Sequence, residues 1–295
     1  MRAAVGRAGL LGAGLLLLAA CSSSAPSAAP PPTTTATTTN SPTSSSTTST
    51  TTSTPTTSTT EARSTAPRPE VPSPTGTLDG LVVVVDPGHN GANGAHAAEI
   101  ERPVDAGGFT KPCNTTGTAG DGYPESRFNW ETAQRVAAAL EARGARVVLT
   151  RDSDDGWGPC VDQRGLTAQR EGAAVIVSIH ADGAAPAASG FHVIHAAAGP
   201  AVTDDVAARS TELAATVRDR LVGAGLQPAT YLGGGTGTVA RTDIATLNRA
   251  GVPGVMVECG NMRNAADLAR LRSPEGQQAI AEAIASAVAE RFGAR

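Results

Sequence analysis

The stretch VVVVDPGHNG, residues 82–91, runs four valines directly into Asp-Pro-Gly and then His89. A short, continuous apolar run is typical of a strand that is buried on both faces, as in a parallel sheet. Open α/β sheets bind their ligands beyond the carboxyl ends of such strands. This stretch therefore predicts a parallel sheet, and it makes His89 a candidate functional residue.

The chain from about residue 78 alternates apolar runs with helical spacing. Further strands are predicted at 146–150, 173–179, 191–194 and 254–257, with a short edge strand at 239–245. Helices are predicted from Pro124-Glu125 to Gly144, over 161–170 and 205–222, and from Ser273-Pro274 onward. This alternation predicts one α/β domain, residues 78–295, with a mostly parallel central sheet flanked by helices and an active site at the C-terminal ends of the strands. It leaves the strand order open.

The N-terminus carries a processing signal. Residues 1–20 have an arginine-containing start, a short apolar core and small residues at the end, as in a signal peptide. Leu18-Ala19-Ala20-Cys21 resembles the lipobox of bacterial lipoproteins, in which the cysteine is lipidated. We therefore expect Cys21 to anchor the protein at the outer face of the cell membrane, next to the cell wall. Plain secretion is the alternative.

Residues 21–77 form a Ser/Thr/Pro-rich segment with no charged residue between Ser22 and Thr60. Such a tract buries too little apolar surface to offset its chain entropy, so we expect a disordered linker. The formal net charge of the whole chain is -4, which does not indicate a nucleic-acid-binding surface. We expect no nucleic-acid partner and a monomeric protein.

Three of the predicted strands end in a side chain that can bind a metal or move a proton. His89, His180 and Glu258 each follow an apolar run, and Glu125 opens the helix after the first strand. All four start from the same edge of a parallel sheet. Two imidazoles and one carboxylate suit a catalytic zinc ion with an open fourth position, and a second carboxylate can serve as a general base.

These residues lie within motifs that resemble the zinc-dependent N-acetylmuramoyl-L-alanine amidase family over residues 81–292. The motifs are Asp86-Pro87-Gly88-His89, Tyr123-Pro124-Glu125, Thr150-Arg151, Arg164, Ser178-Ile179-His180-Ala181, and Val257-Glu258 followed by Gly260-Asn261. The resemblance implies that His89, Glu125 and His180 hold one zinc ion and that Glu258 is the catalytic base. It also implies a peptidoglycan or muropeptide substrate, cut between N-acetylmuramic acid and the L-alanine of the stem peptide.

Two alternatives stay open at this point. A zinc peptidase acting within the stem peptide would need the same ligands, and a non-catalytic cell-wall-binding lipoprotein would need no base. Many members of the family have Asn where this chain has Asp182, which bears on substrate preference. Arg151, Arg164 and Asp182 are candidate substrate-binding residues, with ordinary ion pairs as the alternative for the two arginines.

Three cysteines remain after Cys21. Thiols outside the cytoplasm tend to pair, and Cys113 and Cys160 both lie in polar loops, so a disulfide between them is predicted. Cys259 follows an apolar strand and is expected to be a buried free thiol. The segment 91–122 is long for a mere connection, and we expect it to form a flap over the substrate groove, pinned by the disulfide.

Overall fold

A computed structural model describes residues 77–293 of the chain. The predicted signal peptide 1–20, Cys21 and the linker up to residue 76 lie outside the described residues. None of the helices within 77–293 is both long and apolar enough to cross a membrane.

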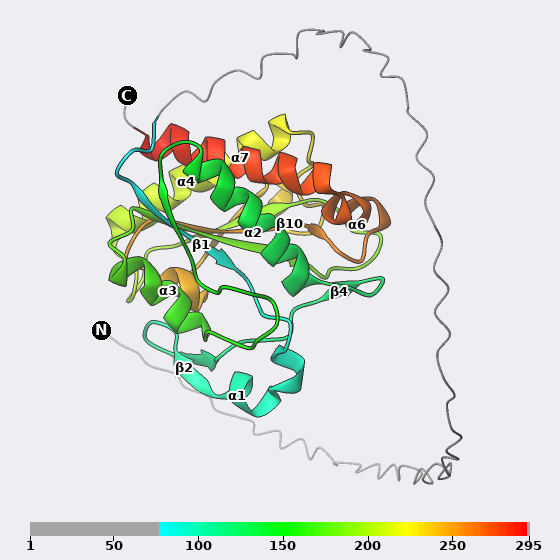
Figure 1. Ribbon diagram of the computed structural model, residues 1–295, viewed down its shortest axis with the longest axis horizontal. Helices are drawn as coiled ribbons and strands as arrows, with labels where there is room; N and C mark the ends of the chain where they lie inside the picture. The colour runs from blue at the N-terminus through cyan, green and yellow to red at the C-terminus, as the bar shows by residue number, and fades with distance from the viewer. Residues whose placement is uncertain (1–76, 294–295) are drawn as a thin grey trace, which may run out of the picture. The chain divides into compact units, whose positions relative to one another are not determined.

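The core of the domain is a six-stranded sheet with the order β6-β1-β7-β10-β8-β9 (Figure 1). Neighbouring strands among the first four are parallel, β8 runs antiparallel to β10, and β9 pairs parallel with β8 at the edge. The strands are β1 (Val82–Pro87), β6 (Arg146–Leu149), β7 (Val175–Asp182), β8 (His192–Ala196), β9 (Thr238–Arg241) and β10 (Gly254–Asn261). The prediction of a mostly parallel sheet in an α/β domain is confirmed.

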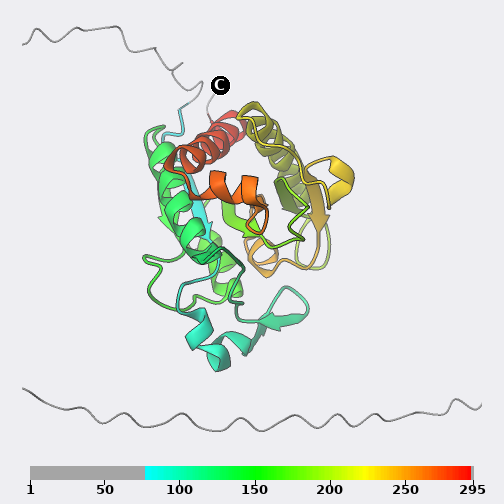
Figure 2. The ribbon, with the colours of Figure 1, turned by 90° about the vertical axis from the view of Figure 1, so that its right-hand side faces the viewer.

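Helices cover both faces of this sheet. Successive valines of β1 point to opposite faces, so Val83 and Val85 join one apolar cluster while Val84 joins the other. The larger cluster lies under α2 (Glu125–Glu141), α4 (Asp204–Gly223) and α7 (Pro274–Phe292), which pack side by side in Figure 2. The smaller cluster lies under α3 (Val161–Arg170) and α5 (Ala245–Asn248), while α6 (Ala265–Arg272) follows β10.

The ends of the main helices follow their sequence signals. Pro124 precedes α2 in an extended conformation, and Gly144 adopts a left-handed φ of 94° just after the helix. Ser273 caps α7 by accepting a hydrogen bond from the backbone N–H of Gly276, and Pro274 occupies the first turn, where a missing N–H costs nothing. Helix α2 therefore begins at Glu125, as predicted.

The remaining elements are short, and the sequence did not predict them. The segment 91–122 contains η1 (Asn93–Ala95), α1 (Ala97–Glu101), the hairpin of β2 (Pro103–Asp105) and β3 (Thr110–Pro112), and β4 (Ala119–Gly120), which pairs with β5 (Tyr123–Pro124). A further turn, η2 (Gly233–Gly235), precedes β9. The edge strand predicted at 239–245 is wrong at its end, because Ala245 begins α5.

Candidate metal centre

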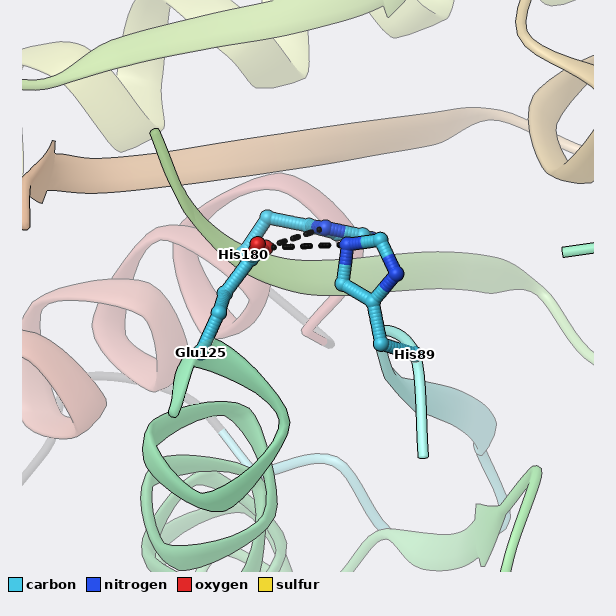
Figure 3. Close-up of side chains that lie close together, drawn as sticks. All are labelled: His89, Glu125 and His180. Atoms are coloured by element: carbon cyan, nitrogen blue, oxygen red, sulfur yellow. Dashed lines mark hydrogen bonds and ion pairs between the residues drawn. The ribbon is translucent and has the colours of Figure 1, made fainter. Parts of the chain in front are cut away.

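Three side chains from different parts of the sequence meet at the C-terminal edge of the sheet (Figure 3). His89 follows β1, Glu125 opens α2, and His180 lies near the end of β7. One possible ligand atom from each lies within 4.8 Å of the others. Glu125 Oε1 is 3.2 Å from His89 Nε2 and 2.9 Å from His180 Nδ1.

The ring of His89 is fixed from its far side. Its Nδ1 lies 3.0 Å from the carbonyl oxygen of Thr115, so Nδ1 donates a proton there and Nε2 is the nitrogen that faces Glu125. The backbone of His89 has a left-handed φ of 57°, which is strained for a residue with a side chain. Arg164 holds this conformation, since its Nη2 donates to the His89 carbonyl oxygen at 2.6 Å.

The carboxylate of Glu125 accepts hydrogen bonds from the surrounding chain. The backbone N–H of Thr118 donates to Oε2 at 2.9 Å, while the N–H of Ala181 and the side-chain amide of Asn129 donate to Oε1 at 3.3 and 3.4 Å. Burial alone would raise the pKa of Glu125, but His89 and His180 outweigh burial and hold it well below the usual value. Glu125 is therefore a carboxylate whose orientation is fixed by the surrounding chain.

Two glycines leave room for these side chains. A Cβ atom at Gly88 would lie 2.1 Å from the imidazole of His180. A Cβ atom at Gly117 would lie 2.7 Å from Glu125 Oε2, and Gly117 also has a left-handed φ of 74°. Larger residues at either position would displace the side chain of His180 or Glu125.

This donor set fits zinc. Two imidazole nitrogens and one carboxylate oxygen are typical zinc donors, and three protein ligands are the number found in catalytic zinc sites. The hydrogen bond from His89 to the Thr115 carbonyl is the kind of second contact that orients metal-binding histidines.

Glu258 and Asp182 line the same cleft as the three side chains, and the volume of this cleft is about 800 Å³. Oε2 of Glu258 is buried and has no hydrogen-bond partner among the described residues. Burial, followed by the negative charges of Glu125 and Asp182, raises the pKa of Glu258 well above its usual value. A carboxyl group in this state is suited to take up and release a proton.

A second, smaller cavity of about 160 Å³ lies on another side of the histidines. Besides His89 and His180, it is lined by Lys111 and the apolar side chains of Ile244 and Met256. The two histidines therefore line both cavities.

Arg151 and Arg164 lie beneath the centre, and their exposed fractions are only 5% and 1%. Arg151 donates to the carbonyl oxygens of Pro87, Gly88 and Ser126, and Arg164 forms an ion pair with Asp86 at 2.8 Å. These bonds are made to the chain itself. We therefore assign both arginines to holding the turn at His89 instead of the substrate-binding role considered from the sequence.

Cys113 and Cys160 form the predicted disulfide, and Cys259 is a buried free thiol. The disulfide ties the segment 91–122 to the start of α3. Within that segment, Cys113 lies only two residues before Thr115. Residues 115–119 of this segment line the cleft beside Glu125. The segment thus forms one wall of the cleft.

The contacts of Thr115 and Asn129 were not predicted from the sequence. Asn129 lies four residues after Glu125 and therefore on the same face of α2, a spacing that could have identified it. Thr115 acts through its backbone carbonyl, which no side-chain pattern reveals.

Comparison with known proteins gives relatives over the same part of the chain. A family model described as N-acetylmuramoyl-L-alanine amidase matches residues 83–290. The chain is 44% identical over 214 residues to the N-acetylmuramoyl-L-alanine amidase Rv3717 of Mycobacterium tuberculosis, covering 72% of this chain and 86% of that protein.

Solved structures agree with this match. The N-acetylmuramyl-L-alanine amidase Ami1 of Mycobacterium smegmatis has 45% sequence identity and a TM-score of 0.69, covering 73% of this chain and 98% of that one. The apo form of Ami1 from Mycobacterium abscessus has 42% identity and a TM-score of 0.68, covering 73% and 100%. The resemblance found in the sequence motifs is confirmed, and the chain belongs to the N-acetylmuramoyl-L-alanine amidase family.

Proposed function

We propose that the protein is a zinc-dependent hydrolase that cleaves the amide bond between N-acetylmuramic acid and L-alanine in peptidoglycan. Family membership and the relatives' names support the substrate and the bond. The observation that carries the chemistry is the meeting of His89, Glu125 and His180 within 4.8 Å, in a cleft that Glu258 also lines; Oε2 of Glu258 has no hydrogen-bond partner among residues 77–293.

His89, Glu125 and His180 would hold the zinc ion, which when bound supplies a Lewis acid and a water molecule of lowered pKa. Glu258 Oε2 then accepts a proton from the attacking water, whose oxygen bonds to the carbonyl carbon of the lactyl group. The C–N bond breaks as Glu258 returns that proton to the nitrogen of L-alanine.

The two cavities suit a substrate that has a sugar and a peptide on opposite sides of the cut bond. The open cleft beside Asp182 is large enough for muramic acid within a glycan strand, and we assign Asp182 to substrate binding there. The smaller cavity, with its apolar walls and Lys111, suits the methyl and acidic groups of the first stem-peptide residues. If the enzyme cut within the stem peptide, the bond at the centre would be a peptide bond, and the sugar would no longer occupy the larger cleft.

Activity on peptidoglycan requires the enzyme to act outside the cytoplasm. We propose that the signal peptide is removed and that Cys21 carries a lipid, which would hold the enzyme at the membrane next to its substrate. The basis is the lipobox-like Leu18-Ala19-Ala20-Cys21. We further propose that the protein acts as a monomer.

Mass spectrometry of a muramoyl-dipeptide digest tests the function. The zinc-loaded wild type should release N-acetylmuramic acid and the intact dipeptide, and a chelator should abolish the reaction. Glu258→Gln should keep its zinc and lose about 10²–10⁴-fold in rate, because the water then has no base. Glu141→Gln, an exposed change at the far end of α2, serves as the matched control.

Two results would contradict the proposal. Release of N-acetylmuramoyl-L-alanine would mean that the enzyme cuts within the peptide. Zinc binding without hydrolysis of either muramoyl-dipeptide or polymer would favour a cell-wall-binding protein instead.

A further inference from the structure

His180, Glu258 and His192 form a row across three neighbouring strands. In the sheet register, Glu258 on β10 pairs with His180 on β7 and with His192 on β8. Directly paired residues project to the same face, and neighbouring strands lie about 5 Å apart. Glu258 therefore stands between a metal-centre histidine and a histidine that is not part of the three-residue group.

The two members of the Glu258–His192 pair both contain an unpaired buried atom. His192 is 2% exposed, and its Nδ1 has no hydrogen-bond partner among the described residues. Oε2 of Glu258 is also buried without a hydrogen-bond partner among the described residues. Leaving such groups unpaired destabilises the fold, so two of them in adjacent positions call for an explanation.

His195 on the same strand offers a contrast. It is also buried, but it points to the opposite face of the sheet, where its Nδ1 lies 3.3 Å from the hydroxyl of Thr211. His195 thus has a partner within the protein and no access to Glu258. Unlike His195, His192 faces the side of the sheet on which Glu258 lines the cleft, and its Nδ1 has no hydrogen-bond partner among the described residues.

We propose that His192 is a positioning residue for Glu258, donating a hydrogen bond from Nδ1 to the Glu258 carboxylate during the reaction. The inference rests on the proposed function, in which Glu258 moves the proton. The hydrogen bond would orient Oε2 toward the water and the leaving nitrogen. His192 is not among the three residues whose possible ligand atoms lie within 4.8 Å of one another.

The surroundings of His192 suit this role. The ring of Tyr231 lies edge-on to His192, with ring centroids 6.1 Å apart. Burial lowers the pKa of His192, so the imidazole is neutral near pH 7 and carries one N–H and one acceptor nitrogen. A neutral donor can orient a carboxylate without neutralising its charge.

The test is a double-mutant cycle with muramoyl-dipeptide as substrate and zinc content measured for each protein. His192→Leu should lower kcat by about 10–100-fold, with KM and bound zinc unchanged within about twofold, because only the orientation of the base is lost. His192→Asn keeps an N–H near the position of Nδ1 and should recover activity to within about threefold of the wild type. His195→Leu is the control on the opposite face and should leave kcat unchanged.

The decisive comparison is made in the Glu258→Gln background. There His192→Leu should change the remaining rate by less than about twofold, since the residue acts through Glu258. Independent, multiplying losses would overturn the proposal, as would an equal loss in His192→Asn or His195→Leu, or full activity in His192→Leu. A wild type without turnover would contradict the proposed function itself, and this result is visible before any His192 variant is compared.

Discussion

Asp86 is the residue that supports the turn carrying His89. Its Oδ1 accepts hydrogen bonds from Arg164 Nη1 at 2.8 Å and from the Thr150 hydroxyl at 2.5 Å, and its Oδ2 accepts one from Ser178 at 2.6 Å. Asp86 and Arg164 are each only 1% exposed. Loss of one partner would leave an uncompensated charge inside the domain.

Asp86 should make stability depend on pH. Burial alone would raise its pKa, but Arg164, Ser178 and Thr150 together lower it below the usual value. A carboxyl group whose pKa is lower in the folded state stabilises the fold above its unfolded pKa of about 3.9. That contribution is lost as the pH falls through the folded pKa. The free energy of unfolding of the wild type should therefore decrease as the pH is lowered below 5. Urea titrations at several pH values measure this decrease.

Asp86→Asn should reduce this pH dependence and lower stability at pH 7 by about 3 kcal/mol, because Arg164 is left buried without its counter-charge. Asp205→Asn, at an exposed ion pair on α4, is the control and should change neither quantity by more than about 0.5 kcal/mol. An equally steep loss of stability at low pH in Asp86→Asn and the wild type would refute this role for Asp86.

At the residue scale, functional side chains that follow apolar runs can be predicted from the sequence. Groups whose position depends on the path of a loop cannot. His89, His180 and Glu258 could be found because each follows an apolar run, although β7 and β10 continue past His180 and Glu258 to Asp182 and Asn261. The carbonyl of Thr115 could not, because its position depends on the path of a long loop. The buried roles of Arg151 and Arg164 also depend on that path, and a charged residue in a sequence does not reveal whether its partner is substrate or chain.

At the scale of elements, the disulfide between Cys113 and Cys160 joins the segment 91–122 to α3. The cysteines are 47 residues apart in the sequence. In the chain-entropy model, closing a loop of this length stabilises the fold by about 4 kcal/mol. The double variant Cys113→Ala with Cys160→Ala should lose about this amount in urea unfolding. Its stability should not respond to a reductant, whereas that of the wild type should fall.

The disulfide should also matter for the wall of the cleft. Because Cys113 lies two residues before Thr115, the double variant should position the His89 ring less firmly and bind zinc more weakly. Weakened zinc binding together with altered turnover on polymer would support the flap expected from the sequence. Zinc affinity and turnover identical to the wild type would show that the segment is a passive connection.

Among the elements, the long periodic ones were predicted with ends within a few residues, as for α3 at Val161–Arg170. Their apolar spacing reflects burial against the sheet, which the sequence encodes locally. The β2–β3 hairpin, α5 and α6 were missed because their short spans give too few positions for a period to show. The strand order was also open, since pairing between distant strands leaves no local signal.

At the scale of the whole molecule, the fold gathers the functional groups by topology. Parallel strands β1, β7 and β10 end at one edge, and α2 starts there, so His89, His180, Glu258 and Glu125 meet although the sequence separates them widely. This convergence was predictable, because the connection between parallel strands sets where each one ends.

The proposed lipid anchor is a property of the full chain. Expressed in a bacterium that processes lipoproteins, the wild type should sediment with membranes, and Cys21→Ala should lose this association, because the residue that would carry the lipid is then missing. Fractionation followed by an assay of hydrolysis checks both location and activity. Equal membrane association of the two proteins would exclude lipidation at Cys21.

Diffraction from zinc-soaked crystals, recorded at the zinc absorption edge, tests the central claim most directly. We predict one anomalous peak per chain, at about 2.0–2.2 Å from a nitrogen of His89, a nitrogen of His180 and an oxygen of Glu125, with Glu258 nearby but not bonded to it. A peak bound by other residues in an enzyme that hydrolyses muramoyl-dipeptide would contradict this account, and so would full hydrolysis by crystals that bind no metal.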